Sequence, residues 1–260
     1  MIALKTWRIL SMWARKAGGG SGDKLYSNRL LVNIMKAITL KVKDIKQYIN
    51  EDFGQMMAVE GFEYKKTNNE YYYKRGGYTY RYNLLLTAWS ASYSITLRLY
   101  ISQHQIEGIY ESVLGKSRHG LTFYQSMIER LYYSSDGRKN GKGDDLTIDI
   151  VNDEGIYTTI ETLKHYYHQI AKPYFGRFKT LEAFDDFINN PPFEYSPAYV
   201  GCNTNERCMK GLIVAKLVNN SNYEKLTAIY DELIKGTLSD VQPDSITNYN
   251  KVKEYLADNF

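Results

Sequence analysis

The spacing of apolar residues changes from helical to alternating within the first part of the body of the chain. Over residues 42–60, apolar side chains recur every three or four positions, and Gly61 follows where a glycine commonly ends a helix. Beyond it, apolar and polar residues alternate, which is typical of strands with one buried face. The alternating segments are residues 62–66, 71–75, 78–86 and 93–101. This pattern predicts a helix followed by a β-meander.

The predicted third and fourth strands each present one continuous apolar face. Gly76-Gly77 precedes the third strand and favours a tight hairpin, because both central positions of such a turn require positive φ. The apolar face comprises Tyr78, Tyr80, Tyr82, Leu84 and Leu86 of the third strand and Ile95, Leu97, Leu99 and Ile101 of the fourth. Since the other face is polar, we expect an antiparallel sheet with helices on one side and water on the other.

The second half of the chain is predicted to be mainly helical. Apolar residues return at helical spacing in several segments, with one short strand at residues 146–150. The helical segments are residues 121–132, 155–170, 181–188, 209–219, 222–235 and 245–257, with a loop containing both cysteines before residue 209. The expected fold class is α+β, an antiparallel β-meander packed against helices and followed by a helical C-terminal region. Residues 35–190 form the α+β domain in this prediction, and residues 191–260 form the helical region packed on it.

Residues 1–17 have the pattern of a basic amphipathic helix. One arc of the helical wheel is apolar, and the opposite arc carries the cations. The apolar arc comprises Ile2, Trp7, Ile9, Leu10, Trp13, Ala14 and Ala17, and the basic face comprises Lys5, Arg8, Arg15 and Lys16. Trp7, Ile9, Leu10 and Trp13 are the expected anchors, because tryptophans in pockets tend to dominate such interfaces. A helix of this kind suits a membrane surface, a targeting role or a partner's hydrophobic groove.

A glycine-rich run separates this helix from the body. The sequence Gly-Gly-Gly-Ser-Gly at residues 18–22 is a flexible coil, and residues 18–34 as a whole form the predicted linker and connector. The run has the composition of an engineered linker, although natural glycine runs exist, and Met35 would suit a native start. An engineered fusion would imply a partner tethered to its receptor, because tethering raises the effective concentration to roughly millimolar.

The net charge of the chain resides in this N-terminal appendage. Four of the 33 lysines and arginines fall within residues 1–22, which contain no acidic residue, and the other 29 balance the 29 acidic residues of the body. A dedicated nucleic-acid binder usually carries a basic domain, so a neutral body argues against that class. The apolar runs are too short to span a bilayer, which leaves residues 1–17 as the segment suited to membrane contact.

Cysteine usage points to a reducing compartment. Cys202 and Cys208 match no zinc-binding spacing, and two cysteines are too few for a disulfide framework. Free thiols predict a cytoplasmic location, and a local disulfide between the two cysteines is the alternative.

The sequence contains no recognisable motif for catalysis, metal binding or cofactor binding. In residues 137–143 the glycine spacing is one residue short of a P-loop, and no Ser or Thr follows the lysine. His165 and His168 lie one helical turn apart, yet neither a third ligand nor a catalytic glutamate accompanies them. We therefore expect a non-enzymatic protein without metal or cofactor. A catalytic site assembled from residues distant in the sequence, around His104, His119 or His165, stays open.

The polar face of the predicted sheet offers an alternative binding surface. Arg81 and Arg98 fall on this face, where they would stand near Tyr100. Some folds use aromatic rings and arginines on a sheet to stack single-stranded bases and to bind phosphate groups. An outer face of mixed charges without a ligand accounts for the same pattern, so both interpretations stand.

A resemblance to a known family is carried by the helix at residues 42–60, the strand Gly-Phe-Glu-Tyr-Lys-Lys at residues 61–66 and the aromatic meander after it. These features resemble the bacterial domain-of-unknown-function 4304 family over residues 42–190. The resemblance implies an α+β fold without established chemistry, and it transfers no functional residue to this chain.

The sequence thus favours a protein-binding module that holds a cationic amphipathic helix, in an immunity-, adaptor- or chaperone-like role. In this hypothesis residues 1–17 are a tethered ligand, and the natural partner is an amphipathic helical peptide or protein. The alternative hypothesis is a nucleic-acid or phosphate ligand bound at Arg81, Arg98 and Tyr100.

Overall fold

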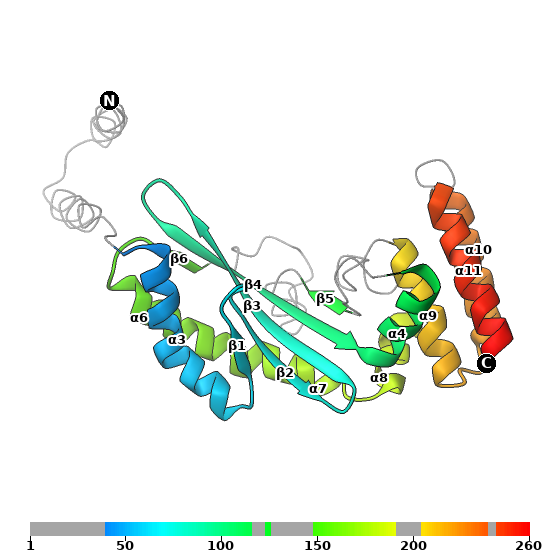
Figure 1. Cartoon of the computed structure of the whole chain (residues 1–260), viewed down its shortest axis with the longest axis horizontal. Helices are drawn as coiled ribbons and strands as arrows, with labels where there is room; N and C mark the ends of the chain where they lie inside the picture. Colours follow the sequence, from blue (N-terminus) through cyan, green and yellow to red (C-terminus); the bar gives the residue numbers. More distant parts are fainter. Residues whose placement is uncertain (1–39, 116–122, 126–147, 191–203, 239–242) are drawn as a thin grey trace, which may run out of the picture.

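The computed structural model describes residues 40–115, 123–125, 148–190, 204–238 and 243–260 (Figure 1). Within these ranges a helix, a β-meander and a largely helical C-terminal region follow one another, so the predicted α+β class is confirmed. The first elements are α3 (Val42–Val59), β1 (Glu63–Lys65), β2 (Glu70–Arg75), β3 (Tyr78–Ala88), β4 (Tyr93–Gln103), α4 (His104–Leu114), β5 (Phe123–Gln125) and β6 (Ile148–Ile150). They are followed by α6 (Gly155–Tyr166), the π-helix η1 (Tyr167–Ala171), α7 (Lys172–Arg177), α8 (Leu181–Asn189), α9 (Thr204–Leu217), α10 (Tyr223–Leu238) and α11 (Pro243–Asn259).

Helix α3 begins and ends where its sequence provides cap interactions. The backbone N–H of Lys41 donates to the Asp44 carboxylate at 3.0 Å, and an acid in the first turn also complements the helix dipole. At the other end Gly61 adopts a φ of +89°, which glycine reaches without steric cost, and the chain turns there toward β1. The buried face of the helix carries Ile45, Ile49, Phe53 and Met57.

The strands form one antiparallel sheet in the order β1-β2-β3-β4-β5, and β6 pairs with the opposite end of β4. Gly76 and Gly77 have φ values of 55° and 83°, as the tight β2–β3 hairpin requires. The register places Tyr82 opposite Tyr71 on one side and opposite Leu99 on the other. Because side chains alternate along each strand, this register collects the predicted apolar residues on one face.

The helices α3, α6 and α7, with η1 between the last two, cover the apolar face of the sheet (Figure 1). Phe53 of α3 packs edge-on against Tyr71, with ring centroids 5.3 Å apart, and its ring lies 5.6 Å from that of Tyr82. Tyr82 is fully buried, and its hydroxyl donates to the Leu163 carbonyl of α6 at 3.4 Å. Burial raises the pKa of Tyr82 well above its ordinary value, so this core tyrosine is neutral.

The C-terminal helices continue this core beyond the sheet. Helix α9 packs against α4, α8, α10 and α11, and its Leu212, Ile213 and Val214 are fully buried. An ion pair joins α9 to α4, with Lys210 Nζ 2.9 Å from the Glu107 carboxylate and both side chains buried. Lys210 Nζ also lies 2.9 Å from the Glu206 carboxylate, so its buried charge is compensated by two acids.

Two sequence predictions differ from the structure. Residues 123–125, expected within a helix over residues 121–132, form β5 against Leu99–Ile101 of β4, and the rest of that segment lies outside the described residues. The edge of β4 offers unpaired backbone donors and acceptors, which favour strand pairing over a short helical pattern. Helix α9 begins at Thr204, so Cys208 lies in a helix and not in a loop. The prediction missed this start because α9 is buried on nearly all sides and lacks an amphipathic pattern.

Phe53→Ala is expected to lower the free energy of unfolding by about 3–5 kcal/mol, because it removes a fully buried ring from the contact between α3 and the sheet. Urea denaturation followed by circular dichroism measures the change. Val59→Ala, at a residue that is 89% exposed on the same helix, is the control and should change the value by less than about 0.5 kcal/mol. Equal losses in the two variants would show that α3 does not supply the core beneath the sheet.

Candidate functional site

Several residues singled out in the sequence lie outside the described ranges. They are the peptide anchors Trp7, Ile9, Leu10 and Trp13, the basic face Lys5, Arg8, Arg15 and Lys16, the loop at residues 137–143, His119 and Cys202. The role of residues 1–17 therefore stays a prediction. The described residues bear on it through the surfaces that such a helix would contact.

The outer face of the sheet brings Arg81, Arg98 and Tyr100 together. Arg81 lies directly opposite Tyr100 on β4 and opposite Tyr72 on β2, while Arg98 lies opposite Asn83. The three predicted side chains are half-buried. Within the described ranges neither arginine forms an ion pair or a hydrogen bond, and the Nε atom of Arg98 is buried without an acceptor there. The surface predicted from alternation thus holds two cations that have no counter-ion among the described residues.

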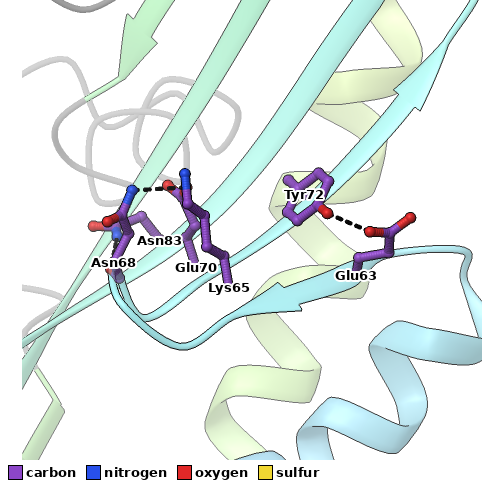
Figure 2. Close-up of polar contacts among 6 residues, drawn as sticks. All are labelled: Glu63, Lys65, Asn68, Glu70, Tyr72 and Asn83. Atoms are coloured by element: carbon purple, nitrogen blue, oxygen red, sulfur yellow. Dashed lines mark hydrogen bonds and ion pairs between the residues drawn. The ribbon is translucent and has the colours of Figure 1, made fainter.

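The acidic residues nearby are engaged with other partners, as Figure 2 shows. The Tyr72 hydroxyl donates to the Glu63 carboxylate, which raises the pKa of Tyr72. The Glu70 carboxylate accepts from Asn68 Nδ2 at 3.1 Å and lies 3.9 Å from Lys65 Nζ. These contacts of the two carboxylates are with Tyr72, Asn68 and Lys65, and neither carboxylate pairs with Arg81 or Arg98 in the described part of the chain.

The described histidines and Cys208 lie on different elements, with His104 on α4, His165 on α6, His168 on η1 and Cys208 on α9. Among the described residues no group of three or more His, Cys, Asp or Glu side chains is placed to hold a metal ion. His104 Nε2 forms a hydrogen bond with Thr79 Oγ1 at 2.9 Å, whereas His165 lies on α6 beside Tyr166. Cys208 is a fully buried free thiol whose pKa burial raises to about 12, so the thiolate nucleophile is not formed at neutral pH.

A surface shared by α3 and α6 combines exposed aromatic rings with carboxylates. We name it the α3–α6 stripe and define it by Tyr48, Glu51, Asp52, Tyr157 and Glu161. Tyr48 is 45% and Tyr157 70% exposed, and the three carboxylates are exposed as well. One lysine of α6 bridges the two helices here, with its Nζ 2.8 Å from Asp52 and 2.8 Å from Glu161. The stripe therefore carries a net negative charge.

The two helices of the stripe run in the same direction. Lys164 of α6 pairs with Asp52 of α3, and eight residues further along both segments, or about two turns, Lys172 of α7 pairs with Glu60. In α3 the aromatic residue lies one turn before Asp52, and in α6 it lies one turn before Glu161. Both exposed rings therefore lie toward the same end of the stripe. The sequence did not reveal this surface, because it is assembled from two helices about 110 residues apart.

A pocket that the sequence also did not reveal opens beside the β2–β3 hairpin. Its volume is about 510 Å³, and its walls come from β2, β3, the end of α3, η1 and α7. Six aromatic residues line it, namely Phe62, Tyr73, Tyr78, Tyr80, Tyr167 and Phe175. Alternation along the third predicted strand indicated that Tyr78 and Tyr80 face the helices. The gap between the sheet and the helices depends on the path of η1 and α7, which has no local signal in the sequence.

Comparison with known proteins gives no relative for this chain: no protein-family model matches it, and no curated protein or solved structure matches it. The fold alone therefore defines the class of this protein, which is an α+β protein whose antiparallel sheet has helices on one face. The resemblance to the domain-of-unknown-function 4304 family stays a prediction. None of the helices in the described ranges combines the length and hydropathy that a bilayer crossing requires.

The pair between Glu60 and Lys172 at the pocket edge is expected to make stability depend on pH. The hydrogen bond from Lys172, whose Nζ lies 2.8 Å from the carboxylate, is the main cause that lowers the pKa of Glu60 below its ordinary 4.5. A carboxyl whose pKa is lower in the folded state stabilises that state above the unfolded-state pKa. This contribution is lost as the pH falls through the folded-state pKa.

Glu60→Gln should therefore lower the free energy of unfolding by about 0.5 kcal/mol at pH 7, and the difference should vanish at a pH well below 4. Urea titrations at several pH values measure both quantities. Glu254→Gln, at an exposed position on α11, is the control and should show no such dependence. A difference for Glu60→Gln that is constant with pH would contradict the assignment.

Proposed function

We propose that this chain is a non-enzymatic protein-binding module that holds a cationic amphipathic helix on the α3–α6 stripe, in an immunity-, adaptor- or chaperone-like role. Residues 1–17 are the tethered ligand in this proposal. Charge complementarity is the observation that carries it, because the stripe places three exposed carboxylates around two exposed tyrosines, whereas the helix brings four cations and no acid. A cytoplasmic location belongs to the proposal and is supported by the free thiol of Cys208.

The dimensions of the chain are compatible with this contact. A helix over residues 1–17 would be about 25 Å long, and α3 with its 18 residues is about 27 Å long. Residues 18–41 join the two, and a flexible chain of that length has a root-mean-square span of roughly 25–30 Å. The connector therefore allows the helix to lie along the stripe, with Trp7 and Trp13 against its tyrosines.

A competition experiment tests the proposal in the full chain. A fluorescently labelled peptide of residues 1–17 is titrated into the unmodified chain and into the Trp7→Ala, Trp13→Ala variant, and binding is followed by anisotropy. The variant should bind the peptide with about 100-fold higher apparent affinity, because the tethered helix of the unmodified chain competes at roughly millimolar effective concentration. Equal affinities would refute docking of residues 1–17 on their own body.

The location of the peptide is tested by reversing charges on the stripe of that double variant. Glu51→Lys combined with Glu161→Lys should weaken peptide binding roughly tenfold for each charge, because like charges then face each other. Glu232→Lys combined with Glu254→Lys makes the same change in net charge on α10 and α11 and should have little effect. If both pairs weaken binding equally, the peptide responds to net charge and the stripe is not its site.

A second candidate function is the binding of a single-stranded nucleic acid or another phosphate ligand at Arg81, Arg98 and Tyr100. The uncompensated charges of the two arginines favour it, together with the buried Nε of Arg98 that lacks an acceptor. Phosphate oxygens would supply such an acceptor, and the rings of Tyr72 and Tyr100 on the same face would stack on bases. The neutral charge of the body makes this the lesser candidate.

Binding of a single-stranded DNA oligonucleotide at several salt concentrations tests this candidate. Arg81→Gln combined with Arg98→Gln should reduce the slope of log affinity against log salt by about 1.4, since each neutralised phosphate of a single strand contributes about 0.7. Lys43→Gln combined with Lys46→Gln, on α3, removes the same charge elsewhere and should leave the slope unchanged. The absence of salt-dependent binding by the unmodified chain would eliminate the candidate.

A further inference from the structure

The pocket beside the β2–β3 hairpin is lined by aromatic rings. On the sheet, Tyr78 and Tyr80 stack with ring centroids 6.1 Å apart and planes that differ by 12°, and Tyr73 and Tyr80 stack with centroids 6.2 Å apart and planes that differ by 22°. Phe62, whose ring centroid lies 6.1 Å from that of Phe175, completes the wall where the chain leaves α3. An aromatic lining favours a ligand with an aromatic body, because aromatic rings attract one another in offset-stacked and edge-to-face contacts. The volume of about 510 Å³ lies in the range of small-molecule sites.

The edge of the pocket is positively charged. Lys172 is paired with Glu60, but Arg75 and Lys179 are exposed and form no ion pair or hydrogen bond within the part of the chain that the structure describes. The wall beneath them is neutral, since burial raises the pKa of Tyr80 to about 12 even though the charge of Arg75 acts in the opposite direction. Two cations without counter-ions beside a neutral aromatic wall attract an anion.

The helix layer leaves open space at one point of this pocket. The helix predicted over residues 155–170 ends as the π-helix η1, which is wider than an α-helix and is a feature often found at functional sites. Gly176 follows in α7, where glycine is disfavoured relative to alanine. A Cβ atom at Gly176 would meet no atom within 4 Å, so packing does not require a glycine there. Its effect is to leave the pocket wall unobstructed.

We propose that this pocket binds a small anionic ligand with a planar aromatic body. The ring system lies among the aromatic residues that line the pocket, beside the half-buried Tyr73, and the anionic group lies between Arg75 and Lys179. This activity goes beyond the binding of a helix. No residue of the α3–α6 stripe lines the pocket, so the two proposals stand or fall separately.

The charge requirement is tested with 8-anilinonaphthalene-1-sulfonate, an aromatic sulfonate whose fluorescence rises in apolar surroundings. The folded full chain should bind one equivalent, and Arg75→Gln combined with Lys179→Gln should raise the dissociation constant at least about tenfold, because two charge-assisted contacts are lost. Binding of N-phenyl-1-naphthylamine, which has the same rings without the sulfonate, should change less than about threefold. Lys235→Gln combined with Lys251→Gln, on α10 and α11, is the control for net charge.

The location is tested by filling the open space in the wall. Gly176→Leu should abolish saturable binding of both probes, whereas Gly176→Ala should leave it within about twofold of the unmodified chain. Thermal unfolding of each variant establishes that it is folded, and the exposed Arg75 and Lys179 variants provide a test that does not depend on packing. The proposal is overturned if the unmodified chain does not bind the sulfonate at one site. It is also overturned if the Arg75→Gln, Lys179→Gln variant binds the sulfonate as tightly as the Lys235→Gln, Lys251→Gln control does.

Discussion

Tyrosine side chains on the inner face of the sheet reach the helix layer with their hydroxyl groups, and the rest of the architecture is built around those contacts. Tyr80 donates to the Phe178 carbonyl at 2.8 Å, and Tyr82 donates to the Leu163 carbonyl. A buried hydroxyl without an acceptor costs on the order of 1–3 kcal/mol. The sheet and the helices therefore cannot shift past each other without losing hydrogen bonds as well as aromatic contact. This requirement sets the distance between the two layers.

The same contacts explain why the pocket lies beside the β2–β3 hairpin. The helix layer follows the inner tyrosines through α6, η1 and α7, and Tyr167 of η1 donates to the Glu60 carboxylate at 3.1 Å. Glu60 in turn pairs with Lys172, so the end of α3 and the start of α7 are held together. Between this junction and the hairpin, aromatic residues of the sheet and of the helix layer line the pocket. The pocket is thus a consequence of how a tyrosine-rich face is covered.

The body is neutral overall, but its charged residues are distributed unevenly over the surface. The α3–α6 stripe is acidic. Arg81 and Arg98 on the outer face of the sheet, and Arg75 and Lys179 at the pocket edge, have no counter-ion among the residues that the structure describes. Local fields of this kind select ligands by sign even when the net charge is close to zero. The stripe favours a cationic helix, the outer face of the sheet favours a phosphate backbone, and the pocket favours a small aromatic anion.

The sequence by itself determined the local elements and their faces. The alternation from Tyr78 to Leu86 predicted the inner face of β3 and set Arg81 on the outer face near Tyr100, because side chains of a strand alternate regardless of what surrounds it.

Tertiary structure decided the features that have no signal in the local spacing of residues. Residues 123–125 became a strand because the edge of β4 was available, and α9 lacks an amphipathic pattern because other helices surround it. Contacts between segments far apart in the chain decide how α3 meets α6 and how η1 passes Tyr82 of the sheet. Those contacts alone decide which charges are compensated and where the surface opens into a site.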